Sequence, residues 1–496
     1  MEALNLWIAK TWFGRYFGLR DGEKGIEDSK FSKELLGGTV TFMSMAYILA
    51  VQPYLMGKAG MPEGAVFAST AFIIAISTIT MGVYSKFPFA LAPGMGTNAI
   101  VMGLVTGGLA DWQTAIGLIF ISGLIFMLTS FRILKWTKPL GAPESVYNFS
   151  LREIIVDAIP VPVKLGLGVI IGLFLGKLAL SATSGLPLDT GNWTDPATLI
   201  GVVMLIITAS LFFLKNKNGQ SLFPGAVLAG IIVTAIILFV TGLAPMPEEI
   251  VKEPDSFMSI FGKLEIFDAF KFEYFPYILV FFMGDFFSTT GTSLSCSRKA
   301  GFMDDAGNVP SIEKVFHIDS LFSVIGAWFG LTTVTTYVES ASGVESGGRT
   351  GITALVTAFW FFVALLFSPL FLALPPIATG VGLAVVGLSM LAVVVDVNDF
   401  KNKPSDFVSV MFMILFMFIT NDFAAALCAT IIFCVIVKII EFFAIKEQKM
   451  AEFEKKCEDK GLDPKKQIVY IISTNAVMFA MGILYFVSQV LAPSTT

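Results

Sequence analysis

Residues 330–350, GLTTVTTYVESASGVESGGRT, and residues 86–104, KFPFALAPGMGTNAIVMGL, decide the fold of this chain. The first stretch opens with β-branched residues and continues with small ones, and the second is interrupted at Pro93-Gly94-Met95-Gly96. Each pattern predicts a few extended residues followed by a short helix. Both stretches lie among long apolar segments. A non-helical backbone at membrane depth is tolerated only where protein or a water-filled cavity surrounds it.

The composition is that of a membrane protein. Of the 496 residues, 55% are hydrophobic and 14% are charged, and the mean hydropathy is +0.78. A soluble globular domain carries about 25% charged residues, and the apolar runs here are long enough to cross about 30 Å of bilayer. The net charge is −5, the four cysteines show no CxxC spacing, and His317 is the single histidine. These features argue against a nucleic-acid-binding protein, a disulfide framework and a metal site, and we expect no cofactor.

The apolar segments predict an all-α polytopic membrane protein with 14 spans, arranged as 7+7 inverted repeats. The first set covers approximately residues 34–56, 63–85, 87–104, 113–130, 163–180, 196–214 and 222–242, and the second covers 275–296, 313–330, 332–346, 350–373, 376–396, 406–420 and 422–444. Because seven is odd, the two sets insert with opposite orientation. The interrupted stretches are the third and tenth spans, and broken segments at matching positions of inverted halves point to a transporter substrate site near the bilayer midplane.

The distribution of lysine and arginine sets the orientation. These residues concentrate in alternate loops, and this bias predicts that the N-terminus lies in the cytoplasm. We expect the protein to lie in the cell membrane (plasma or inner). The leader before the first span is predicted to be cytoplasmic and amphipathic. A further apolar stretch, 469–491, either spans or lies along the interface.

Two acids lie well inside the predicted spans. Asp285 lies half-way along FPYILVFFMGDFFSTTGTSL (275–294), and Glu339 lies where the extended piece of the tenth span meets its short helix. Burying an acid in hydrocarbon costs at least about 2.5–3.5 kcal/mol, so a function is the favoured explanation; a carboxylate that merely pins helices together is the alternative. We interpret Glu339 as an acceptor for adjacent N–H donors of a neutral ligand, and Asp285 as a group that is loaded and unloaded with H⁺.

Other side chains in these segments are weaker candidates. Asn98 either reads a ring carbonyl or N–H group, or bridges the two half-helix ends structurally. Phe286 and Tyr337 could stack on a flat ring, but in a chain with 48 phenylalanines most aromatic side chains face lipid or core.

Five stretches of the sequence carry a family resemblance. They are GGTVTFMSMAYILAVQP (37–53), FALAPGMGTNA (89–99), REIIVDAIPVPVKLGLGVIIG (152–172), MGDFFSTTGTSL (283–294) and TVTTYVESASGVESGGRTGITAL (333–355). They resemble the AzgA-like purine permeases of the nucleobase–cation symporter-2 (nucleobase/ascorbate transporter) family. The resemblance implies proton-driven symport of hypoxanthine, guanine or adenine by a protein with a core domain and a gate domain, and a possible homodimer.

The resemblance also implies roles for particular residues. The family's substrate asparagine falls on Asn98, its first acid in the eighth span falls on Asp285, and its acid in the tenth span falls on Glu339. Tyr337 and Val338 stand beside that acid, where backbone N–H groups contact the base. The usual second aspartate of the eighth span is Ser288 here, a substrate-binding candidate that keeps a hydroxyl but cannot carry charge. This difference leaves the proton stoichiometry and the base preference open.

The implied domains divide the chain into six regions. These are a cytoplasmic N-terminal leader (1–33), a first core-domain region with spans 1–4 (34–130), a first gate-domain region with spans 5–7 (163–242), a second core-domain region with spans 8–11 (275–373), a second gate-domain region with spans 12–14 (376–444) and a cytoplasmic tail with the extra apolar or interfacial stretch (445–496).

A proton-coupled purine permease is the favoured function. The alternatives are an anion transporter of the sulfate or bicarbonate type with the same fold, and a uracil- or xanthine-type nucleobase permease. A membrane enzyme is disfavoured, because the sequence has no HExxH, DDxxD or GxSxG motif.

Overall fold

The computed structural model describes residues 2–19, 26, 29–130, 161–181, 186–188, 194–214, 222–223, 225–247, 249–302, 309–391, 404–420 and 423–444. The elements of the first half are α1 (Glu2–Lys10), α2 (Trp12–Phe17), α3 (Phe31–Met45), α4 (Ile48–Lys58), α5 (Glu63–Thr80), the π-helical turn η1 (Met81–Ser85), β1 (Leu91–Pro93), α6 (Met95–Thr106), α7 (Trp112–Ser130), α9 (Val161–Ala179), α10 (Pro196–Phe213) and α11 (Ala226–Val240).

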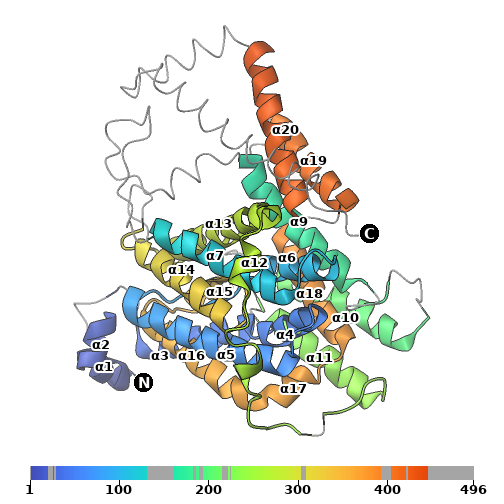
Figure 1. The fold of residues 1–496 in the computed structure, drawn as a ribbon. Helices are drawn as coiled ribbons and strands as arrows, with labels where there is room; N and C mark the ends of the chain where they lie inside the picture. Colours follow the sequence, from blue (N-terminus) through green and yellow to red (C-terminus); the bar gives the residue numbers. More distant parts are fainter. Residues whose placement is uncertain are drawn as a thin grey trace, which may run out of the picture.

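The second half begins with short helical turns and continues with longer helices. Its elements are η2 (Phe257–Ser259), α12 (Ile266–Ala269), η3 (Phe272–Tyr274), α13 (Phe275–Ala300), α14 (Glu313–Trp328), β2 (Val334–Thr336), α15 (Ser340–Glu345), α16 (Gly351–Ala364), η4 (Leu365–Phe367), α17 (Ser368–Leu372), α18 (Pro376–Leu391), α19 (Pro404–Thr420) and α20 (Phe423–Ala444). Figure 1 shows a helical bundle, with α1 and α2 at one edge and α20 reaching outward at another.

Several helices have the length and apolar composition of membrane spans. Among the described residues, five segments are long and apolar enough to cross a membrane: 31–58, 63–85, 112–130, 196–213 and 351–372. Shorter apolar helices, among them α6, α11 and α18, accompany them. The chain is therefore a mostly helical, multi-pass membrane protein. The stretch 469–491 and the whole tail from residue 445 lie outside the described residues, as does the beginning of the 152–172 motif.

The two interrupted segments pair with each other. Strand β1 runs antiparallel to β2, with Leu91 opposite Thr336 and Pro93 opposite Val334. The N–H of Gly94 extends the ladder by donating to the carbonyl of Thr333 (2.8 Å). Each strand is followed by a short helix, α6 or α15, so the prediction of extended residues followed by a half-helix is confirmed in both segments. In the two-stranded ribbon of β1 and β2, each strand supplies the backbone hydrogen-bond partners that the other needs and that the bilayer cannot supply.

The first predicted span contains a break that the sequence does not indicate. Helix α3 ends at Met45, Ala46 and Tyr47 form a turn, and α4 begins at Ile48. The break places Tyr47, which is 2% exposed, inside the protein.

The helices fall into two groups by their contacts. Helices α9, α10, α11, α18, α19 and α20 contact one another, and α3–α7 contact α13–α17. The groups meet where α6 and α13 touch α9, where α13 touches α20, and where α3 touches α11 and α4 touches α18.

A buried carboxylate joins α3 to the segment after α15. Glu34, which is 0% exposed, accepts hydrogen bonds from the backbone N–H of Thr350 (3.1 Å) and the hydroxyl of Thr353 (2.5 Å). It thereby satisfies N–H groups at the start of α16, as a capping residue does. Nearby, α3 and α15 approach closely enough that a Cβ on Gly343 would meet the carbonyl oxygen of Gly37 at 2.5 Å. This end of α15 is therefore held firmly against α3.

Candidate functional site

Tyr337 joins the two interrupted segments. Its backbone N–H donates to the carbonyl of Ala90 (2.9 Å), and its hydroxyl donates to the carbonyl of Pro93 (2.7 Å). The side chain is 6% exposed. Both donors of this predicted site residue therefore hold β2 against β1.

Glu339 is the residue immediately before α15. Its Oε1 accepts a hydrogen bond from the hydroxyl of Tyr47 (2.8 Å), 292 positions earlier in the chain. The side chain is partly exposed, and its neighbour Val338 is 56% exposed. The carboxylate is thus oriented by one buried donor and keeps further acceptor sites for a ligand.

Asn98 is enclosed on α6. It is 0% exposed, its Nδ2 donates to Gln52 Oε1, and its Oδ1 accepts from the hydroxyl of Thr332 (2.5 Å). Gln52 belongs to α4 and Thr332 comes just before β2. Of the two interpretations of Asn98, the structural bridge between the broken segments is the one that these contacts favour.

Asp285 lies in the middle of α13 and is 1% exposed. Its Oδ2 accepts a hydrogen bond from the hydroxyl of Ser323 on α14 (2.7 Å), whereas Oδ1 receives none from the described residues of the protein. The same Ser323 hydroxyl accepts from the N–H of Val334 in β2 (3.1 Å). The Asp285 carboxyl is therefore connected to the ribbon of β1 and β2 through one side chain, that of Ser323.

Phe286 and Ser288 point in different directions from α13. Phe286 is 4% exposed and its ring lies 5.9 Å from that of Phe126 and 6.0 Å from that of Phe316, measured between centroids. It is packed between α7 and α14, an arrangement that leaves no open ring face for stacking. Ser288 is exposed, on the side of the helix that carries the exposed Gly291.

The predicted site residues therefore divide into two sets. The structure brings Glu339, Val338 and Ser288 to accessible positions, and it encloses Asn98, Tyr337, Phe286 and Asp285.

The sequence patterns did not single out another buried acid, Asp319, which lies near the broken segments. This α14 residue is 0% exposed and accepts from the hydroxyl of Thr289 (2.5 Å) and from the N–H and hydroxyl of Thr336 (both 3.0 Å). It connects α13, α14 and β2. Asp319 lies inside the predicted span 313–330, so the rule that selected Asp285 could have found it. Tyr47 and Gln52 were also missed, and no spacing pattern marks them.

We expect Asp319→Asn to destabilise the protein. The asparagine replaces an acceptor oxygen by an NH₂ group that faces donors, and a buried hydrogen bond to a charged group contributes about 1.5–3 kcal/mol. The purified protein in detergent should melt at a clearly lower temperature. The matched control is Asp111→Asn, because the exposed Asp111 accepts from the N–H of Thr114 (3.0 Å) at a helix start, where asparagine caps equally well. Equal melting temperatures for both variants would contradict this role.

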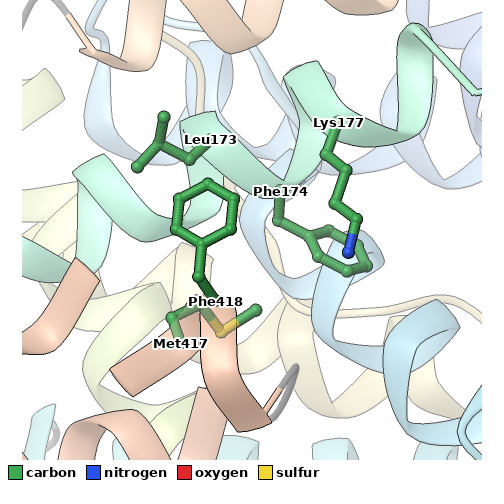
Figure 2. Close-up of a pocket in the computed structure, with 5 residues that line it drawn as sticks. All are labelled: Leu173, Phe174, Lys177, Met417 and Phe418. Atoms are coloured by element: carbon green, nitrogen blue, oxygen red, sulfur yellow. The ribbon is translucent and has the colours of Figure 1, made fainter. Parts of the chain in front are cut away.

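One surface hollow lies apart from these residues. Leu173, Phe174 and Lys177 of α9 and Met417 and Phe418 of α19 line it, and Figure 2 shows Lys177 extending beside Phe174. It contains none of the predicted site residues. Within the described ranges, no three His, Cys, Asp or Glu side chains are close enough together to hold a metal ion.

The arrangement has the features of a secondary transporter. Two broken segments meet inside a multi-pass bundle, a partly exposed carboxylate stands beside them, and a buried carboxyl lies one hydrogen bond from a side chain that binds the ribbon. Such discontinuous segments form substrate sites in many transporter folds. The class of protein is therefore a membrane transporter, not an enzyme.

Comparison with known proteins gives the family. Residues 32–420 match the model of the Permease family (Xan_ur_permease), and the chain belongs to this family. It is 32% identical to the adenine permease AdeQ of Escherichia coli (strain K12) over 79% of this chain and 84% of that protein. It is 34% identical to the guanine/hypoxanthine permease PbuG of Bacillus subtilis (strain 168) over 73% of this chain and 81% of that protein.

A solved structure shares the fold. The transmembrane domain of the cyanobacterial bicarbonate transporter BicA matches 84% of this chain and 99% of its own, with a TM-score of 0.53 and 15% sequence identity. At this identity the match concerns the fold alone.

Proposed function

We propose that the protein takes up purine nucleobases (hypoxanthine, guanine or adenine) together with protons, by alternating access. The observation that carries the proposal is the Glu339 carboxylate, partly exposed beside the paired broken segments and oriented by Tyr47. A neutral purine presents adjacent N–H groups, and an ionised carboxylate accepts hydrogen bonds in that geometry. The relatives with adenine or guanine/hypoxanthine in their names support the same substrate class.

The coupling step is assigned to Asp285. Protonation removes a charge from a site that is closed to water, and the charged form is costly to bury. The hydroxyl of Ser323 forms hydrogen bonds both with Asp285 and with the backbone of β2. A single side chain therefore connects the proposed proton site to the broken segment. The energy source is the proton gradient, and no cofactor takes part.

The moving parts in this proposal are the two contact groups. Helices α3–α7 and α13–α17 form the core domain, and α9–α11 and α18–α20 form the gate domain, within a 14-span, 7+7 inverted-repeat fold. The contacts within each group support this division. The protein would lie in the cell membrane with a cytoplasmic N-terminus, and a homodimer would form through the gate domain.

An anion substrate is less compatible with the site. A sulfate or bicarbonate ion beside the broken segments would stand close to the Glu339 carboxylate, and like charges repel. The other accessible residues of the predicted site, Ser288 and Val338, carry no positive charge that would offset this repulsion.

A competition experiment tests the proposed function. Cells that lack their own purine permeases and express this chain should accumulate labelled hypoxanthine, adenine or guanine, and unlabelled purines should compete, whereas uracil and sulfate should not. An uncoupler that collapses the proton gradient should abolish accumulation. Competition by uracil or xanthine alone would instead identify the protein as a uracil- or xanthine-type permease. Electrogenic flux of bicarbonate or sulfate would overturn the proposal.

A further inference from the structure

The N-terminal helices α1 and α2 dock on the ends of three membrane segments. Asn5 of α1 and Ser32 of α3 exchange two hydrogen bonds, from Asn5 Nδ2 to Ser32 Oγ and from the Ser32 N–H to Asn5 Oδ1 (both 3.1 Å). The hydroxyl of Tyr16 donates to the carbonyl of Val83 in η1 (3.0 Å). Ala9 and Phe17 pack in one apolar cluster with Ile352 of α16.

These contacts fix the depth of the two helices relative to the bilayer. Residues 32, 83 and 352 lie at the ends of the candidate spans 31–58, 63–85 and 351–372. The helices α3, α5 and α16 pack together, so these three ends lie at the same membrane surface. The helices α1 and α2 must therefore lie at the boundary between hydrocarbon and water, beside the bundle as Figure 1 shows.

The face of α1 and α2 turned away from the protein is aromatic. Trp7 and Trp12 are 66% and 78% exposed, and Leu6 and Phe13 are 44% and 37% exposed. Tryptophan concentrates at the membrane–water interface, where its ring has an apolar environment and its N–H a polar one. In water, an exposed surface of this kind would be unfavourable.

The surrounding residues fit a lipid headgroup layer. Lys10 and Arg15 are exposed on the same two helices. Lys86, which is also exposed, lies over the ring of Tyr16, with its Nζ 4.2 Å from the centroid. On the spans that α1 and α2 contact, the side chains of Leu36 (55%) and Tyr84 (49%) are also exposed. Long basic side chains reach headgroups from this position.

We infer that α1 and α2 form a lipid-binding element, which packs on the membrane segments by one face and inserts Trp7 and Trp12 into the headgroup layer of the adjoining leaflet. This inference does not depend on the substrate. The occupant of the aromatic face is lipid, not a second copy of the chain.

Quenching of tryptophan fluorescence tests the inference. The full-length protein is reconstituted into vesicles of phosphatidylcholine or brominated phosphatidylcholine, and the variant Trp7→Phe/Trp12→Phe is measured beside the wild type. Because both side chains are largely exposed, the double variant should fold and reconstitute normally. The signal lost in the variant should be a component that brominated lipid quenches and aqueous iodide does not.

Other results would overturn the inference. If iodide quenches the Trp7/Trp12 component, the face is turned to water. If neither quencher reaches it, a protein surface covers the face. Trp112→Phe is the control, since it removes one tryptophan from the start of α7 without touching the N-terminal helices.

Discussion

Replacing Glu339 by glutamine is expected to weaken purine binding roughly 10- to 150-fold, because a hydrogen bond to a charged group contributes about 1.5–3 kcal/mol and each 1.4 kcal/mol corresponds to a factor of ten. Glutamine has the size of glutamate and can still accept from Tyr47, whose hydroxyl lies 2.8 Å from Oε1. It lacks the charge, however, and places an NH₂ group where the base presents N–H donors. Equilibrium binding of labelled purine to the purified protein measures the loss directly.

Tyr47→Phe is the matched control for this prediction. It removes the donor that orients the carboxylate and leaves the carboxylate in place, so binding should weaken less than in Glu339→Gln. Uptake should follow the same order. Wild-type binding by Glu339→Gln would show that this side chain does not hold the base, and the proposed recognition would then be wrong.

Replacing Asp285 by asparagine should abolish accumulation against a gradient while leaving exchange of purine across the membrane. Asparagine occupies the same buried position and can accept from Ser323, which bonds to Oδ2 at 2.7 Å in the wild type. It cannot take up or release a proton at physiological pH, so the transport step loses its driving ion. Proteoliposomes separate the two activities: uptake driven by an imposed proton gradient should vanish, and counterflow of labelled against unlabelled purine should remain.

Thr290→Val is the control on the same helix. The hydroxyl of Thr290 donates to the carbonyl of Phe286 (2.8 Å), so valine preserves shape and removes a bond within α13. Both activities should stay near the wild-type level. Proton-driven accumulation by Asp285→Asn would assign the coupling group elsewhere, with Asp319 as the next carboxylate along the network.

The broken segments could be predicted because local sequence determines them. Pro93 and Gly94 interrupt one apolar segment, and the β-branched run from Thr332 to Thr336 favours extended backbone in the other. Their pairing follows from the need of each strand for hydrogen-bond partners inside the membrane. The positions of Asp285 and Glu339 in the spans were visible for the same reason, since a buried acid stands out among apolar residues.

The partners of these residues could not be predicted. Asn98 bonds to Gln52 and Thr332, which are 46 and 234 positions away in the chain. The turn at Tyr47 has no proline or glycine to mark it, and its position is stabilised by the contact with Glu339, 292 positions away. Phe286 was indistinguishable from other aromatic residues until its neighbours on α7 and α14 were known. Long-range packing decides each of these cases.

The ribbon formed by β1 and β2 also has a consequence for the synthesis and membrane insertion of the chain. Tyr337 and Pro93, which it brings together, are 244 positions apart. A ribosome adds about 5–20 residues per second, so β1 waits roughly 12–50 s for its partner to be synthesised. During that interval its backbone N–H and C=O groups have no strand to pair with, and hydrocarbon offers them none. The nascent first half must therefore be sheltered by the insertion machinery or by water until the second half arrives.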